Sequence, residues 1–346
     1  MRETLLRFFA VSLLFWATLA SAEAVRGLYS ARVAVDDQSS ETLARASMDA
    51  LGQVLVKVSG SVDALSNPAI QEELPNARSH VQQYAFERET GPGGGLWARF
   101  EFDSSYVTRL VTQARLPLWT ANRPRVLAWL VVEEQGQRQF VSLDGTPELA
   151  TELLAEFDQR GVPAQLPLFD LADATAISAD DIWQLDGRAA QAASQRYDVE
   201  DVLIGRVVAM STGEWLGDWS YLHGNHRLDR NESAPESRGF ARLGVTLVAE
   251  EMASRYAVAP ASGSEGLVLM SVSGVNQYSD YASIVNWLER MELIDHANVR
   301  QISGDTLELG LVSLADAEAL TKIISLNEHL EPLDSMPGQL DYQWLK

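Results

Sequence analysis

The chain contains no cysteine among its 346 residues. This absence excludes a disulfide framework, a lipid-modified cysteine and thiol chemistry. Lysine is scarce as well, since it occurs only at Lys57, Lys322 and Lys346, and the formal net charge is −21. Without a basic patch, binding to phosphate backbones or to anionic lipid headgroups is disfavoured. We therefore expect no nucleic-acid partner.

Long apolar runs are missing except at the N-terminus. There, Arg2 and Arg7 precede an apolar run that closes with a small-residue site ending at Ala22, which predicts a secretory signal peptide over residues 1–22. Glu3 weakens the positive charge ahead of the run, so an uncleaved signal anchor is the alternative. No later run approaches the roughly 20 residues that a bilayer span needs. We expect a soluble protein of the bacterial periplasm, with no transmembrane segment after cleavage.

Length and composition indicate a folded protein of two or three domains, because the chain is 46% hydrophobic and 22% charged. Hydrophobic periodicity predicts the order β-α-β-β-α within residues 23–118 and again within residues 261–346, as in small ferredoxin-like modules. Residues 119–260 alternate strands with helices, which predicts a central α/β sandwich with a mixed sheet. The small and polar residues of 260–266 predict a linker. The expected fold is therefore α/β (α+β), with two small modules flanking the central domain.

Local signals add detail to this outline. Thr146 directly before Pro147 is typical of a helix start. Ser313 and Asp316 have the spacing of a capping box. The tail GQLDYQWLK places Tyr342 beyond the last predicted module, where its aromatic residues either cover a sheet edge or recruit a partner, and we favour the first role.

One polar stretch, QRYDVEDVLIGRVVAMSTGEWLGDWSYLHGNHRLD, has the composition of a catalytic site. Within it, Trp215, Gly217, Trp219 and Tyr221 alternate with period two, as in a half-buried hairpin. We interpret the two tryptophans as core residues, and an aromatic platform for a ligand is the alternative.

The same stretch contains the candidates for a metal site, His223, His226 and Asp229. Gly-Asn between the histidines is typical of a turn, and the helical H-E-x-x-H arrangement of zinc proteases is missing. An acidic loop is the second candidate, but it lacks the spacing of a calcium loop, and its last residues instead form a helix cap. The acidic side chains of that loop are Asp170, Asp173, Asp180 and Asp181. We expect neither a metal nor another cofactor.

Serine-nucleophile motifs are also missing. The chain has no G-x-S-x-G segment, and no lysine has a serine three positions before it. No catalytic residue is therefore predicted.

Four stretches together support a family resemblance: PRVLAWLVVEE, RGVPAQLPLFDLAD, SQRYDVEDVLIGRV with the tryptophan hairpin after it, and ASRYAV. Over nearly all of its mature length the chain resembles an uncharacterised proteobacterial family of exported proteins, domain-of-unknown-function family two-thousand-and-sixty-six. The resemblance implies a bacterial envelope protein and carries no catalytic residues over. At the level of fold alone, the small modules are similar to those of envelope assembly factors, including flagellar-assembly proteins and activators of penicillin-binding proteins.

These observations favour a non-catalytic binding or assembly accessory factor of the cell envelope, with an envelope protein as its partner. The candidates for partner binding are the aromatic side chains of Trp215, Trp219, Tyr342 and Trp344. Two alternatives stay open. A metal-assisted hydrolase would bring the histidines and the acidic loop together, and a carrier of small ligands would have a large apolar cleft between domains.

Overall fold

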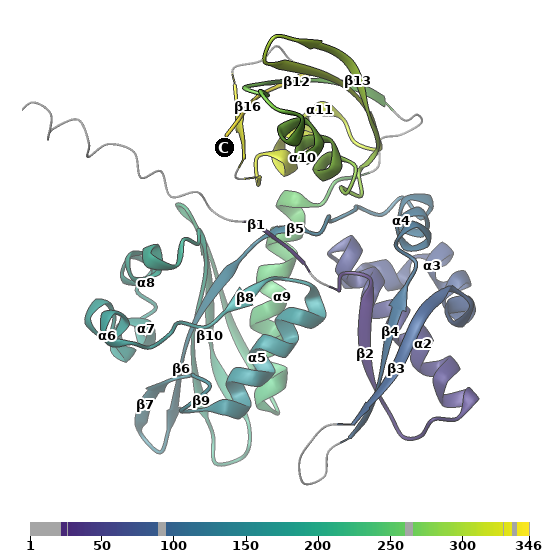
Figure 1. Cartoon of the computed structure of the whole chain (residues 1–346). Helices are drawn as coiled ribbons and strands as arrows, with labels where there is room; N and C mark the ends of the chain where they lie inside the picture. The colour runs from purple at the N-terminus through teal and green to yellow at the C-terminus, as the bar shows by residue number, and fades with distance from the viewer. Residues whose placement is uncertain are drawn as a thin grey trace, which may run out of the picture.

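The computed structural model describes residues 22–25, 27–88, 95–259, 266–327, 329–333 and 338–345. Most of the predicted signal peptide, of the glycine-rich stretch 89–95 and of the predicted linker lies outside the described residues. The fold is α+β, as predicted, and Figure 1 shows its three parts, each built on its own sheet. We call them the N-terminal module, the central domain and the C-terminal module. That each part folds independently, with boundaries at residues 118 and 260, stays a prediction.

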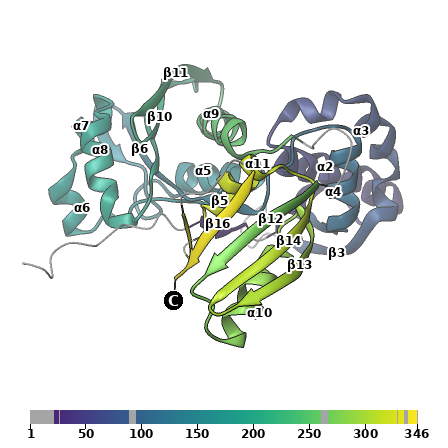
Figure 2. The same cartoon turned by 90° about the horizontal axis from the view of Figure 1, so that it is seen from above.

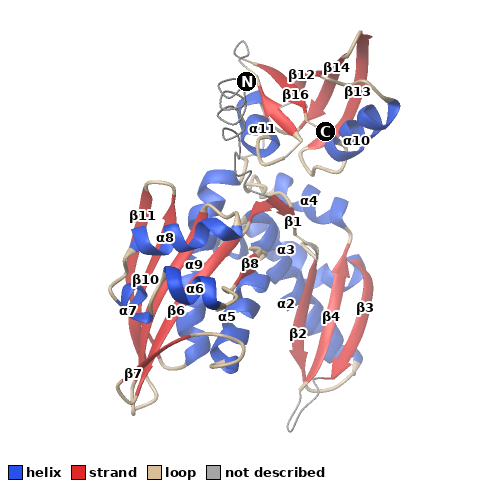
Figure 3. Ribbon diagram, turned by 60° about the vertical axis from the view of Figure 1, so that its left-hand side comes forward, coloured by secondary structure: helices blue, strands red, loops and turns tan. Residues whose placement is uncertain are grey.

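The N-terminal module has the predicted order β-α-β-β-α, and its antiparallel sheet has the strand order β2-β4-β3. Helix α2 starts because the Ser39 hydroxyl accepts a hydrogen bond from Thr42 N at 3.2 Å, and it ends at Gly60, whose φ of 78° suits glycine. The elements are β2 (Ser30–Val35), α2 (Ser40–Ser59), η1 (Val62–Ser66), α3 (Pro68–Glu73), η2 (Leu74–His80), β3 (Val81–Arg88), β4 (Leu96–Phe102) and α4 (Ser104–Gln113). Figure 3 shows the helices gathered on one face of this sheet.

The central domain has a mixed six-stranded sheet in the order β11-β10-β9-β6-β7, with β8 beside β6 and the β6–β9 pair parallel. Its elements are β6 (Val126–Glu134), β7 (Gln137–Phe140), α5 (Pro147–Arg160), β8 (Ala164–Gln165), α6 (Leu171–Ala176), α7 (Ala179–Trp183), α8 (Gly187–Ser194), η3 (Gln195–Tyr197), β9 (Asp201–Ala209), β10 (Trp215–His223), β11 (His226–Ala234) and α9 (Ser237–Tyr256). Helices α5 and α9 cover one face and α6, α7 and α8 the other, which produces two separate cores. Strand β6 is therefore almost entirely buried.

The predicted half-buried hairpin is wrong in one respect. Strand β10 pairs with β9 on one side and with β11 on the other, so it lies inside the sheet. The predicted turn is limited to Gly224 and Asn225, and the chain resumes as strand β11 at His226. Helices cover both faces of the sheet, so the second half of β10 is buried on both sides.

Trp219 is a core residue, as interpreted from the sequence. Its side chain is 0% exposed and stacks on Phe240 with ring centroids 4.9 Å apart. The indole lies between Gly205 of β9 and Gly244 of α9, because a Cβ atom built on either glycine falls 2.4 Å from the ring. Because these two residues are glycines, there is space for the indole ring between the strand and the helix.

The C-terminal module has a five-stranded sheet in the order β13-β14-β12-β16-β15, and Figure 2 shows its strands from above. Its elements are β12 (Gly266–Ser273), α10 (Tyr278–Leu288), β13 (Ile294–Ser303), β14 (Thr306–Ser313), α11 (Ala317–Ile324), β15 (Leu330–Pro332) and β16 (Gln339–Trp344). The tail forms β16, parallel to β12, so the sheet-covering role favoured for it is confirmed. The capping box predicted at Ser313 is wrong, because Asp316 caps α11 by accepting from Ala319 N at 2.9 Å. The Ser313 hydroxyl instead donates to Leu293 O.

A buried arginine connects the N-terminal module to the central domain. Arg123 is 0% exposed, and burial lowers its pKa to about 9, which leaves the guanidinium protonated at neutral pH. It donates to Lys57 O and Gly161 O at 2.7 Å, and to Thr120 O and Trp119 O at 2.8 Å. One side chain therefore joins the end of α2 to the end of α5. We call this set of bonds the Arg123 clamp.

The C-terminal module contacts the same joint. Tyr29 donates from its hydroxyl to Glu292 Oε1 at 3.3 Å, and the same carboxylate accepts from Ala121 N. The buried apolar residues of the N-terminal and C-terminal modules form one continuous cluster. Burial raises the pKa of Glu292. All three parts of the chain thus meet at one junction.

Candidate functional site

The three metal candidates of the sequence do not form a site. His223 and His226 face each other across the β10–β11 turn, but Asp229 is three residues beyond His226 and points to the other face of the sheet. Each side chain has its own partner: His223 Nδ1 lies 3.0 Å from Asp201, His226 Nε2 lies 3.4 Å from a glutamate of α9, and Asp229 accepts from an arginine. Among the described residues, no group of three His, Asp or Glu side chains could hold a metal ion.

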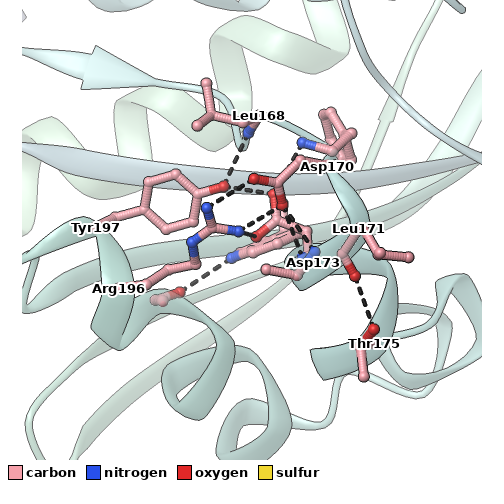
Figure 4. Close-up of polar contacts among 11 residues, drawn as sticks. Leu168, Asp170, Leu171, Asp173, Thr175, Arg196 and Tyr197 are labelled. Atoms are coloured by element: carbon pink, nitrogen blue, oxygen red, sulfur yellow. Dashed lines mark hydrogen bonds and ion pairs between the residues drawn. The ribbon is translucent and has the colours of Figure 1, made fainter.

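The predicted acidic loop contains the two short helices α6 and α7, and Figure 4 shows its first part bound to its own neighbours. Arg196 donates to both carboxylate oxygens of Asp170, at 2.6 and 2.8 Å, and to Asp173 at 2.9 Å. Tyr197 donates to the other oxygen of Asp173 and accepts from Leu168 N. The hydrogen bonds from Arg196 hold the pKa of Asp170 well below its usual range, and burial raises that of Tyr197 to about 12. These bonds join the start of α6 to η3, which is a structural role.

The other two acidic residues of that loop also have structural roles. Asp181 forms the capping box of α7 with Ser178, as predicted, and Asp180 forms an ion pair with Arg138 at 3.0 Å. The histidines and this loop therefore belong to separate hydrogen-bond networks.

For two of the four aromatic candidates for partner binding, the prediction is wrong because their side chains are buried. Trp219 is 0% exposed and Tyr342 is 1% exposed, so neither side chain is available to a partner. Alternation along their strands turns both rings toward helices. Trp215 and Trp344 are only partly buried, but they lie on the sheets of different parts of the chain.

A cleft between the N-terminal module and the central domain has the features of a binding site. Strand β2 and helix α2 form one wall, and helix α5 forms the other (Figure 1). We call it the α5–β2 cleft. It encloses about 480 Å³, within the range of roughly 300–1,000 Å³ seen for small-ligand sites. Its lining residues are Gly27, Ser30, Ala31, Arg32, Gln53, Lys57, Glu87, Trp97, Arg99, Thr151, Glu152, Ala155, Asp158, Gln159 and Arg238.

Lys57 is the most deeply buried charge in this cleft. It extends from α2 and is 4% exposed, and its ammonium donates to Ser30 O at 3.2 Å. Burial lowers the pKa of Lys57, and the negative charge of Asp158 offsets part of this effect. Within the described part of the chain, no carboxylate lies within ion-pair distance of Lys57. A buried ammonium that lacks a close counter-ion favours the binding of an anionic group.

Two of the other three cationic groups of the cleft, Arg32 and Arg238, are held in place. Arg32 lies over the Trp97 ring, 4.3 Å from its centroid, and forms an ion pair with Glu87 at 3.3 Å. Arg238 donates at 2.7 Å to Glu156, which is 2% exposed. Both walls therefore present ordered polar side chains.

Two buried polar atoms at the cleft have no hydrogen-bond partner among the described residues. They are Trp97 Nε1, which is a donor, and Glu152 Oε2, which is an acceptor. Lys57 can donate three hydrogen bonds, and one to a protein group is present. Buried polar groups are normally paired, and Lys57 therefore has donors left that a ligand in the cleft could use.

Sequence reasoning missed this cleft. Its walls come from segments about 100 residues apart, such as Lys57 and Gln159, and no spacing rule connects them. The one available signal was a lysine within the apolar run VLVKVSG, on the buried side of a helix. The expected feature for a ligand carrier was a large apolar cleft. The observed lining is instead rich in charged side chains.

The comparisons with known proteins agree with an uncharacterised domain. Residues 22–120 match the model of a family described as Domain of unknown function (DUF8605). The match covers the N-terminal module, and with it the β2 and α2 wall of the α5–β2 cleft. No curated protein matched the chain. Over the residues that the structure describes, no helix combines the length and hydrophobicity of a membrane span.

Proposed function

We propose that this chain is an exported, non-catalytic binding protein that acts as an assembly accessory factor of the bacterial cell envelope. The α5–β2 cleft is its binding site, and the observation that supports this role is the buried ammonium of Lys57 on its wall, which has no carboxylate within ion-pair distance among the described residues. The signal-like N-terminus supports export to the periplasm. The family resemblance noted from the sequence supports a place in the envelope.

The fixed walls of the cleft suit a binding role. The Arg123 clamp bonds to Lys57 O on one wall and to Gly161 O at the end of the other, so the two walls are fixed relative to each other. A preformed site loses little conformational entropy when a partner binds. The interaction therefore uses a surface that exists before the partner arrives.

A carrier of small ligands is the second candidate, because the cleft volume of about 480 Å³ suits a small molecule. The charged lining would select a polar ligand. The metal-assisted hydrolase has no comparable support, because the histidines and the acidic loop each have other partners.

Site-specific crosslinking tests the binding role. A photoreactive amino acid at Gln159, in the cleft, is expected to form a discrete crosslinked species in living cells. The same probe at Glu318, whose side chain is 83% exposed on α11, is the control. Filling the cleft by Ala155→Trp should abolish the crosslink from Gln159. Crosslinks that are equal at both positions, or that persist in the Ala155→Trp variant, would contradict the proposal.

Export makes a separate prediction. Because the small-residue site ends at Ala22, the mature protein is expected to begin at Glu23. Intact-mass spectrometry of the periplasmic fraction measures this directly. A species that retains Met1 would show that the N-terminal segment is not cleaved.

A further inference from the structure

Strand β2 is an edge strand that faces the α5–β2 cleft. The order β2-β4-β3 leaves β2 with one neighbour, β4, among the described residues. Its other side borders the cleft, because Ser30 and Arg32 of β2 line it together with Glu152 of α5. An edge strand presents a row of unpaired N–H and C=O groups.

The register identifies which groups of β2 are free. Tyr29 O accepts from Phe102 N at 2.9 Å, so Tyr29 belongs to the hydrogen-bonded set that points toward β4. In an antiparallel pair this set alternates, which turns the backbone groups of Arg32 and Ala34 away from β4. The bond from Lys57 Nζ to the carbonyl of Ser30 confirms the alternation, because that carbonyl also points away from β4.

From this placement we propose that the α5–β2 cleft binds an extended peptide segment of a partner, which adds to β2 as a further strand and directs a carboxylate to Lys57. The inference rests on the binding role proposed above and specifies its ligand. Backbone pairing with Arg32, which lines the cleft, and with Ala34, the next outward-facing residue of the same strand edge, supplies the affinity, as in other cases of strand addition. The carboxylate comes from a side chain or from a chain end.

An extended peptide would form hydrogen bonds with more groups of the cleft than a small anion would. A free carboxylate would pair with Lys57 and leave the backbone edge of β2 without partners. An extended peptide presents donors and acceptors alternately along its length, which is the pattern that the edge offers. The buried ammonium and the free edge together therefore favour a peptide.

The test uses the full chain and defined probes. The main probe is a synthetic hexapeptide that alternates valine and glutamate, with both ends blocked. We expect saturable binding, with hydrogen exchange at the Arg32 and Ala34 amides slowed at least tenfold by NMR. The same peptide N-methylated on alternate residues cannot form the ladder and should bind at least tenfold more weakly. A version with a free C-terminal acid and serine for glutamate distinguishes a chain end from a side chain.

Two protein variants locate the contacts. Lys57→Met should weaken binding of the glutamate peptide at least tenfold, and Lys322→Met, on the exposed side of α11, should not change it. Ala34→Pro removes a free edge N–H and should weaken binding to a similar extent. Its control, Arg88→Pro, changes the outer edge of β3. Thermal melts of all four variants establish that they are folded.

The outcomes separate this inference from the proposed function. If free glutamate binds as tightly as the hexapeptide and the Arg32 and Ala34 amides stay unprotected, strand addition is overturned and the cleft is a small-anion site. Equal affinity for the N-methylated peptide would also overturn it. If no probe binds and the crosslink from Gln159 is absent as well, both the inference and the proposed binding role are wrong.

Discussion

Replacing Arg123 with methionine should lower the free energy of unfolding by about 3–5 kcal/mol, as expected when a buried charged group is removed from its partners. The guanidinium donates to carbonyl oxygens of Lys57, Gly161, Thr120 and Trp119, and all four oxygens lose this donor in the variant. Each buried acceptor left without a donor costs about 1–3 kcal/mol. Urea unfolding followed by circular dichroism measures the change.

Two comparisons show whether geometry or charge matters. Arg123→Lys keeps the charge but cannot reproduce the planar fork of donors, so most of the loss should remain. Arg290→Met removes an exposed arginine and should change stability by less than about 0.5 kcal/mol. A stable Arg123→Met protein, or full recovery in Arg123→Lys, would show that the four carbonyl bonds are not what holds the walls of the cleft.

The second large effect concerns Trp219. Trp219→Ala should cost about 3–5 kcal/mol, because it removes a fully buried ring and leaves a cavity. A sharper result is expected on the helix that packs against the ring. Gly244→Ala should destabilise the protein by about 1–3 kcal/mol, since the new Cβ atom would lie 2.4 Å from the indole, which Gly205 confines from the other side.

The matched control is the same substitution on another helix. In α2, a Cβ atom on Gly52 would meet only Leu65, at an ordinary 3.4 Å. Gly52→Ala should therefore stabilise the protein by about 0.5–1 kcal/mol, the usual gain of alanine over glycine in a helix. Thermal melts of both variants show whether each substitution stabilises or destabilises the protein. If Gly244→Ala were also stabilising, the indole would not be confined as described, and Trp219 would have room to serve as a ligand platform.

Periodicity predicted those elements whose side chains alone decide their structure. Helix α2 followed from its apolar stripe, and strand β6 from the run VLAWLVVEE. Strand β11 could not be found in this way, because apart from Leu228 and Ala234 its sequence HRLDRNESA is polar and shows no apolar alternation. It is a strand because β10 beside it supplies nine residues of antiparallel partners. Pairing with a neighbour, and not propensity, determines its conformation.

Site residues were predictable only where the chemistry is local. The turn at Gly224 was correct, and it argued against a metal site before any geometry was known. The cleft was not predictable, because Lys57 and Glu152 become neighbours only when two separate sheets pack together. The capping-box prediction at Ser313 failed for a related reason. That serine bonds to Leu293 in the neighbouring segment, and the helix starts later.

The Arg123 clamp also determines how this protein is free to evolve. Its acceptors are main-chain oxygens, which every amino acid has, so substitutions at Lys57 and Thr120 leave those acceptors in place. Gly161 is one exception, because its φ is 65° and a Cβ atom there would lie 2.9 Å from the guanidinium. Trp119 is a second exception, because the centroid of its buried ring lies 3.7 Å from the guanidinium carbon of Arg123. Among relatives, position 123 should therefore stay arginine, position 161 glycine and position 119 aromatic. The joint between the two walls is thus inherited through three residues, and the surfaces around it are free to diverge toward different partners.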